Sequence, residues 1–248
     1  MRYFNKIGET RPYLVSFDLE WTKNYKIKYG NEPFCFSFVL INNELNDSEP
    51  NEKIEFSFIA YYIDIKAEIP KLVKEADKLL EEFFAKKSII VGHQLSSDIS
   101  IAKVTGEKHS QHLDNISKLK HYWHIRKTPN LDNVRVFDTR YDIGHLLKGK
   151  SRRLVDVSFE CNLDVSQPEI SSSMTKMQNA YYETQDKSIM EKLLVMNIRH
   201  SLSAALLYMI GYNNKKPENI INVNNILYNN LKKHFGYINT DLFNNLLS

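Results

Sequence analysis

Hydrophobic and polar residues follow one another along the chain in a pattern that predicts strands first and helices later. Residues 13–20 begin with an apolar run, and residues 33–41 are dense in aromatic and β-branched side chains, so both segments are expected to be strands. A polar loop that contains Pro50 leads to residues 54–64, a third segment of strand character. Three successive strands joined by turns predict an antiparallel meander.

The next part of the chain predicts a helix, a strand and a second helix. Residues 69–87 place apolar side chains at helical spacing and carry Pro70 near their start, which indicates an amphipathic helix. Residues 88–92 are expected to be a short buried strand, followed by a helix with Ser96 and Ser97 as possible N-caps. Because this strand follows a helix, it is expected to run parallel to its neighbour in the sheet.

The second half of the chain is predicted to be mainly helical. The expected elements are a strand running into a helix at 133–147, a helix at 151–163, a loop at 166–176, one or two helices at 186–211 with Gly211 as the stop, and a terminal helix at 223–235. This order predicts an α/β fold in which a mixed β-sheet, an antiparallel meander plus parallel strands, is flanked by helices. We expect one domain over residues 1–211 and an Asn-rich helical extension, residues 212–248, packed on it.

Composition excludes several classes of protein. Apolar residues make up 42% and charged residues 25%, which excludes a disordered or fibrous chain. Cys35 and Cys161 are far apart and have no CxxC partner, which indicates a reducing compartment and argues against a cysteine-based zinc site. No signal-like segment and no run of roughly 18 apolar residues is visible. We therefore expect a soluble intracellular protein, cytoplasmic or nuclear, with no membrane association.

Net charge is +3, too small by itself to predict nucleic-acid binding, but the basic residues are clustered. One cluster lies between Lys103 and Lys127, and a second consists of Lys148, Lys150, Arg152 and Arg153. Two interpretations stay open: a solvated helix face and loop, or contacts with a polyanion if an active site lies nearby.

Two carboxylates stand at the end of the first predicted strand. In the segment LVSFDLEW, Asp18 and Glu20 are two residues apart, so a strand would place them on the same face. Either the strand meets water there, or a cation holds the two groups together. Asp98, at the start of the helix after the strand 88–92, could join them at one edge of the sheet, and such oxygen ligands suit Mg²⁺ or Mn²⁺.

Five segments resemble, in order, those of the DEDD superfamily of 3′-to-5′ exonucleases, which have a ribonuclease H-like fold. VSFDLEW is similar to the first motif, FDxE, and VGHQLSSDISIAK to the second, GHNxxFD. VFDTRYDIGHLL and RRLVDVSFECNL resemble the next strand and helix, and NIRHSLSAALLY matches the apolar pattern of the third motif, D-A-x-A-T-A-x-L-Y. Together these segments lie within residues 13–211. The resemblance implies a ribonuclease H-like mixed sheet.

The third motif departs from the family pattern. His200 stands at the position of the fourth aspartate, while Val195 and Met196 stand where the family has its catalytic His or Tyr. If His200 is instead aligned with the catalytic His, the aspartate position holds Ala205. Under either alignment one metal-binding acid is missing, and so is the usual residue that activates the water.

The resemblance implies a site with two divalent cations, Mg²⁺ or Mn²⁺, that hydrolyses phosphodiester bonds of single-stranded DNA or RNA. Asp18 would bridge both cations, Glu20 would bind the first, Asp98 the second, and His200 would replace the last ligand. An imidazole ligand favours Mn²⁺ over Mg²⁺. The alternative is a ribonuclease H-like domain that lacks catalysis and binds nucleic acid or a protein partner.

Substrate contacts are predicted from residue type. Trp21, Tyr25, Tyr122 and Trp123 could stack on bases or simply pack in the core, and the candidate phosphate ligands are Lys118, Lys120, Arg126, Lys148, Lys150, Arg152 and Arg153. His93 is a candidate substrate contact, with a hydrogen-bonded scaffold as the favoured alternative. Asp138 is expected to cap a helix rather than bind metal. His109, His112, His121 and His124 contain two HxxH spacings, for which a solvated or phosphate-facing helix is favoured over a zinc site.

Overall fold

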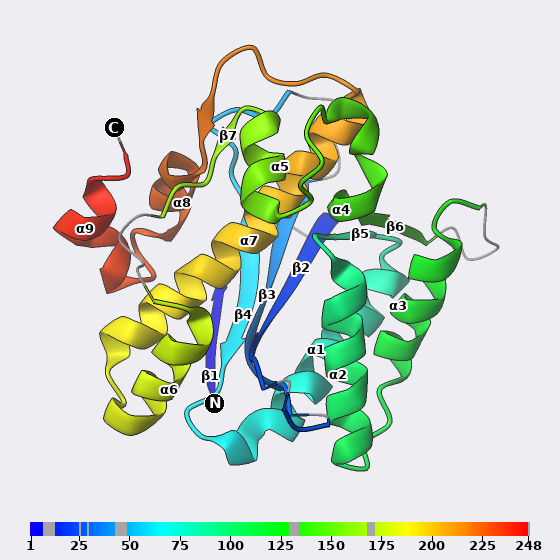
Figure 1. Cartoon of the computed structure of the whole chain (residues 1–248), viewed down its shortest axis with the longest axis vertical. Helices are drawn as coiled ribbons and strands as arrows, with labels where there is room; N and C mark the ends of the chain where they lie inside the picture. The colour runs from blue at the N-terminus through cyan, green and yellow to red at the C-terminus, as the bar shows by residue number, and fades with distance from the viewer. Residues whose placement is uncertain are drawn as a thin grey trace.

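A mixed six-stranded sheet forms the centre of the protein (Figure 1). The computed structural model describes residues 1–6, 13–24, 26–28, 30–42, 49–128, 134–167 and 172–247. Its strand order is β1-β4-β3-β2-β5-β6, with bounds β1 Arg2–Lys6, β2 Tyr13–Thr22, β3 Glu32–Asn42, β4 Ser57–Tyr62, β5 Ile89–Gly92 and β6 Arg135–Asp138. The pairs β1–β4, β4–β3 and β3–β2 are antiparallel, whereas β2–β5 and β5–β6 are parallel. The predicted α/β class, with a meander continued by parallel strands, is confirmed.

Helices flank this sheet on both faces. Their bounds are α1 Ile69–Ala85, α2 Leu95–Lys108, α3 Asp114–Ile125, α4 Thr139–Asp142, α5 Leu154–Glu160, α6 Met174–Thr184, α7 Lys187–Asn213, α8 Val223–Leu231 and α9 Asp241–Asn244. A second, two-stranded sheet pairs β7, Leu163–Asp164, with β8, Ile221–Asn222, in parallel. In Figure 1, α7 crosses in front of the large sheet, and α2 and α3 stand beside its parallel end.

The alternation of side chains along β3 separates the two faces of the sheet. The Ser37 hydroxyl lies 2.7 Å from that of Ser201 on α7, whereas the ring of the next residue, Phe38, lies 5.0 Å from the ring of Phe83 on α1. Because β2 pairs with β3 in a register that places Asp18 opposite Ser37, the Asp18 side chain is on the face that α7 covers. Glu20, two residues later, shares that face.

Helix α7 is a core helix. An 18-residue window of it is long and apolar enough to cross a membrane, which the sequence analysis had not recognised, but 94% of that window is buried inside the protein. Gly211 was expected to end the helix, and this prediction was wrong, since α7 continues to Asn213 and Asn214 closes it in the left-handed region with φ 51°.

Other boundaries differ from prediction for identifiable reasons. The third predicted strand is shorter because Phe56 is held outside the sheet, its amide N–H donating to Asn230 Oδ1 at 3.1 Å. Ser96 and Ser97 lie inside α2 and do not cap it, since the N-cap position is Gln94 in the left-handed region with φ 61°. The elements without a predicted counterpart include β1, the two-residue strands β7 and β8, α9, and α6, which begins within the expected loop where Ser173 accepts from the Lys176 amide.

The C-terminal segment packs on the main sheet and on α7. The Lys6 ammonium on β1 donates to Asn230 Oδ1 on α8 at 3.0 Å, and the Phe4 and Phe235 rings are 5.2 Å apart. Lys192 of α7 stands over the Tyr237 ring, 5.7 Å from its centroid. The residues after 212 thus pack into the same hydrophobic core as the residues that precede them.

Gly211→Ala is expected to destabilise the protein by about 1 kcal/mol. A Cβ at this position would stand 2.6 Å from Ile143 Cγ2 and 3.4 Å from Phe137 Cζ, and Ile143 is fully buried. Overpacking costs about 1–3 kcal/mol, whereas alanine gains about 1 kcal/mol over glycine in a helix. Urea unfolding followed by circular dichroism measures the difference. Gly144→Ala is the control, because its nearest neighbour, Arg152 Nη2, is 3.9 Å away; equal stability of both variants would contradict the close contact at Gly211.

Candidate metal site and cleft

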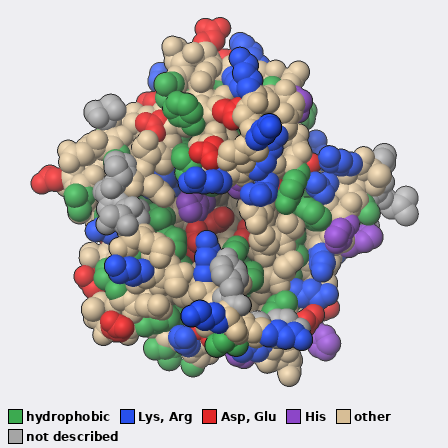
Figure 2. Space-filling view, viewed as in Figure 1, with side chains coloured by type: hydrophobic (Ala, Val, Ile, Leu, Met, Phe, Trp, Pro, Cys, Tyr) green, Lys and Arg blue, Asp and Glu red, His purple; other side chains and the backbone are tan. Residues whose placement is uncertain are grey.

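A cleft of about 850 Å³ opens where the end of β2, the start of α2 and the middle of α7 meet. Figure 2 shows His and acidic side chains in a hollow on this face, with Lys and Arg side chains around it. The residues that line the cleft are Asp18, Leu19, Glu20, Trp21, Lys23, His93, Gln94, Ser97, Asp98, Arg153, Gln167, Ser172, Ser173, Met174, Thr175, Met196 and His200. Its volume is that of a small-molecule site.

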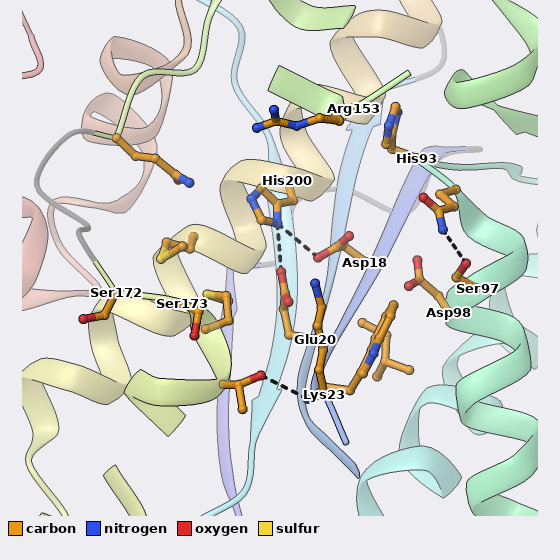
Figure 3. Close-up of a pocket in the computed structure, with 17 residues that line it drawn as sticks. Asp18, Glu20, Lys23, His93, Ser97, Asp98, Arg153, Ser172, Ser173 and His200 are labelled. Atoms are coloured by element: carbon orange, nitrogen blue, oxygen red, sulfur yellow. Dashed lines mark hydrogen bonds and ion pairs between the residues drawn. The ribbon is translucent and has the colours of Figure 1, made fainter. Parts of the chain in front are cut away.

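Asp18, Glu20 and His200 form a compact cluster in this cleft (Figure 3). His200 Nδ1 lies 2.8 Å from Glu20 Oε1 and 3.7 Å from Asp18 Oδ2. One ligand atom from each residue lies within 4.8 Å of the others. Among the residues that the structure describes, this is the one group of three or more His, Cys, Asp or Glu side chains within reach of a single ion.

Asn197 orients the Asp18 carboxylate. Its Nδ2 donates to Asp18 Oδ2 at 2.7 Å and to the Asp18 carbonyl at 3.2 Å. Asn197 is fully buried and precedes His200 by three residues, so both side chains lie on the face of α7 that meets β2. The same face of α7 therefore carries both His200, which lies beside the acids of β2, and Asn197, which orients Asp18.

Asp98 lines the same cleft from the first turn of α2. Its side chain is 3% exposed, and no described group hydrogen-bonds its Oδ2. Burial raises the pKa of Asp98 well above its ordinary value, and the charges of Asp18 and Glu20 raise it further. Buried carboxylate oxygens are normally paired, so this one suits a cation or a substrate group.

In the absence of a bound cation, the two acids favour the protonated form of His200. Burial alone lowers the pKa of His200, but the hydrogen bonds and charges of Asp18 and Glu20 outweigh it and raise the pKa to about 10. Burial raises the pKa of Glu20, and its hydrogen bond from His200 counteracts this. At neutral pH His200 is therefore an imidazolium whose charge balances the two acids.

The donor set fits a divalent cation. Two carboxylates and one imidazole are hard oxygen and borderline nitrogen ligands, a combination that favours Mn²⁺ or another transition metal over Mg²⁺. His200 would have to lose its ring proton to bind, because only the neutral imidazole is a ligand. Asp98, outside the cluster but in the same cleft, offers its unpartnered Oδ2 to the same site or to a second cation.

His93 lines the cleft, but both of its ring nitrogens are bonded. Nε2 lies 2.9 Å from the Arg152 carbonyl and Nδ1 lies 2.9 Å from Thr139 Oγ1. Because a carbonyl only accepts, Nε2 carries a proton; burial lowers the pKa of His93 to about 4, so the ring is neutral and Nδ1 can accept from the Thr139 hydroxyl, which also lies 3.3 Å from the Gly92 carbonyl. These bonds are those of the scaffold that the sequence analysis favoured over a substrate contact.

The predicted aromatic and basic contacts divide into two groups. Trp21 and Arg153 line the cleft. The residues outside its lining are Lys118, Lys120, Arg126, Lys148, Lys150, Arg152, Tyr122 and Trp123. Arg126 instead pairs with Asp142 at 2.9 Å and lies on the Trp123 ring, 4.4 Å from its centroid. Tyr122 is buried at 2% exposure, and Tyr25 lies outside the described residues.

Two further predictions concern structural residues. Asp138 caps α4, as expected, since it accepts from the Arg140 amide at 3.1 Å, and it also accepts from the Gln94 amide and Trp123 Nε1. Cys35 and Cys161 are both buried and unpaired. The four histidines of the 109–124 segment do not form a three-residue metal group in the described structure.

Several residues at the site had drawn no functional interpretation from the sequence. They are Lys23, Gln94 and Ser97, which line the cleft, the segment 172–175 at the start of α6, and Asn197, which bonds Asp18. The spacing of three between Asn197 and His200 on one helix face was the available signal for Asn197. Nothing in the sequence indicated that α6 would begin at the cleft.

No protein-family model matches the chain, and no curated protein matches it significantly. The function of this protein is therefore inferred from the geometry of the cleft and the chemistry of the residues in it.

His93 is expected to make stability depend on pH. Burial lowers the pKa of His93 from 6.5 to about 4. Because the folded-state pKa lies below the unfolded one, this contribution is complete above pH 6.5 and is lost as pH falls towards 4. Between pH 7 and about 4.5 the loss amounts to roughly 2–3 kcal/mol.

Urea unfolding of the wild type and of His93→Gln at both pH values isolates this contribution, since glutamine does not titrate. The wild type should lose more stability than the variant on acidification. Parallel losses in the two proteins would show that His93 is not held neutral.

Proposed function

We propose that this protein is a metal-dependent 3′-to-5′ exonuclease with a ribonuclease H-like fold, acting on single-stranded DNA or RNA. The observation that carries the proposal is the meeting of Asp18, Glu20 and His200, from two elements 180 residues apart, within 4.8 Å of one another in a cleft that also holds Asp98. Asp18, Glu20 and Asp98 are positions at which the chain resembles the DEDD exonucleases, and His200 stands where their pattern has its fourth aspartate. The mixed sheet is compatible with their fold.

The roles of the chain's own residues follow from their positions. Asp18, Glu20 and His200 would hold a divalent cation, Asp98 would complete its ligands or hold a second one, and Asn197 would keep Asp18 oriented. The cation would lower the pKa of a bound water and polarise the phosphodiester. Hydrolysis adds water across the P–O3′ bond, which releases a nucleoside 5′-monophosphate and leaves a new 3′-hydroxyl.

Water activation would depend on the cation. Val195, at one position of the family's activating residue, is fully buried, and Met196, at the other, presents a thioether that cannot accept a proton at neutral pH. Met196 nevertheless lines the cleft. The proposed enzyme therefore has no side-chain general base at these positions, and a modest turnover is expected.

One observation favours the second candidate function, a catalytically inactive domain that binds nucleic acid or a protein partner. His200 Nδ1 lies 2.8 Å from Glu20 Oε1, a geometry that would also suit an ion pair joining α7 to β2 without a part in catalysis. Metal binding separates the two candidates.

Manganese titration is the first experiment. Calorimetry is expected to detect Mn²⁺ binding to the wild type, with at least about tenfold weaker binding by Asp18→Asn. Glu183→Gln, an exposed acid on α6, is the matched control and should bind as the wild type does. Binding that is absent, or equal in all three proteins, would favour the inactive domain.

Cleavage is the second experiment. With Mn²⁺, a 5′-labelled single strand should shorten stepwise from its 3′ end, and Asp18→Asn should reduce the rate by about 10²-fold or more. His200→Asp restores a fourth carboxylate and should shift activity towards Mg²⁺. DNA and RNA strands assayed side by side identify the substrate. No release with either metal would overturn the proposal.

A further inference from the structure

One backbone oxygen, the Arg152 carbonyl, anchors the rim of the cleft. It accepts from His93 Nε2 at 2.9 Å and from Arg140 Nη1 at 3.1 Å. His93 extends from the end of β5, and Arg140 from α4, where its Nη1 also donates to Gln94 Oε1 at 2.9 Å. Two side chains from two elements thus hold one peptide unit in place.

Arg153 follows this anchored peptide directly. Its own carbonyl accepts the Val157 amide at 3.0 Å, because Arg153 is the N-cap residue of α5. The backbone of Arg153 is therefore held on both sides. Its side chain is 78% exposed, lines the cleft, and forms a 3.7 Å ion pair with Asp156. Figure 3 shows Arg153 on the side of the cleft next to His93 and His200.

Two cationic side chains stand beside the acids of the cleft. The Lys and Arg side chains that line it are Lys23 and Arg153, where their charges would attract a polyanion. In Figure 3 they approach the acids from opposite sides. Of the two, Arg153 carries the planar guanidinium, whose donors match the oxygens of a phosphate.

We infer that Arg153 binds a backbone phosphate of the substrate at the mouth of the cleft, and that His93 and Arg140 are its positioning residues, acting through the Arg152 carbonyl. This inference rests on the proposed function, since it takes the polyanion to be a single strand entering the cleft. The neighbouring Arg152 has a different role. Its Nη1 donates to the carbonyls of Gly149 and Ser151, so its guanidinium closes the loop before α5.

Strand binding without metal tests the phosphate contact. Anisotropy of a 5′-labelled strand of about 12 nucleotides in EDTA, over about 50–300 mM salt, reports binding while hydrolysis is blocked. Arg153→Ala should weaken binding about fivefold at low salt and reduce the salt slope by about 0.7, the loss of one phosphate contact. Arg135→Ala, an exposed arginine on β6 outside the cleft lining, removes the same charge elsewhere and should change binding less.

A double-mutant cycle tests positioning. His93→Ala and Arg140→Met should each weaken binding severalfold in the wild-type background and have no further effect when Arg153 is already alanine. His93→Gln, which retains a donor for the Arg152 carbonyl, should recover most of the affinity. Circular dichroism at the assay temperature confirms that each variant is folded.

Several outcomes would overturn the inference. These are a wild type that does not bind the strand at low salt, an Arg153→Ala variant that behaves as Arg135→Ala does, and additive effects of His93→Ala and Arg153→Ala. The exonuclease proposal fails separately, through absent nucleotide release with Mn²⁺. Strand binding that depends on Arg153 without any nucleotide release would contradict the enzyme but support the phosphate contact.

Discussion

Helix α7 lies close enough to the sheet for the Ser201 and Ser37 hydroxyl oxygens to be 2.7 Å apart. This approach is possible because the residues of α7 in this region, including Ser201, Ala204 and Ala205, are small and fully or almost fully buried. The candidate site depends on it. Larger side chains at these positions would move the helix outward and withdraw His200 from Glu20. The packing of one helix on one strand pair thus sets the distance at which an imidazole meets two carboxylates.

Two buried aspartates, Asp138 and Asp98, differ in how fully their oxygens are hydrogen-bonded. Asp138 accepts hydrogen bonds from the Gln94 amide, the Arg140 amide and Trp123 Nε1, and these bonds join β6, α3 and the start of α2. Asp98 is equally inaccessible but has an oxygen without a described partner. Leaving a carboxylate oxygen unpaired costs free energy, and native proteins concentrate such costs at functional sites. The contrast supports a ligand for Asp98 and a structural role for Asp138.

The cleft combines acids at its base with cations at its edge, and the fold supports each in a different way. Asp18 and Glu20 belong to a central strand, while the Arg153 backbone is held through a neighbouring carbonyl and a helix start. Because the backbone at Arg153 is already held in place, it would lose less backbone entropy on binding than a mobile segment would. Lys23 is held differently, since its amide donates to Thr175 Oγ1 at the start of α6.

The sequence by itself determined the elements and the chemistry they carry. Apolar runs and helical spacing predicted β2, β3, α1 and α7, because burial periodicity is a local property, and the motifs predicted Asp18, Glu20, Asp98 and His200 as candidate ligands. Only the tertiary structure decided which of these groups meet. Asn197 at Asp18, the bonds that hold His93 neutral, the anchoring of Arg153 and the position of α6 beside the cleft all depend on contacts between residues distant in the chain. Such contacts arise from the way strands and helices distant in the sequence pack on one another, which no local pattern encodes.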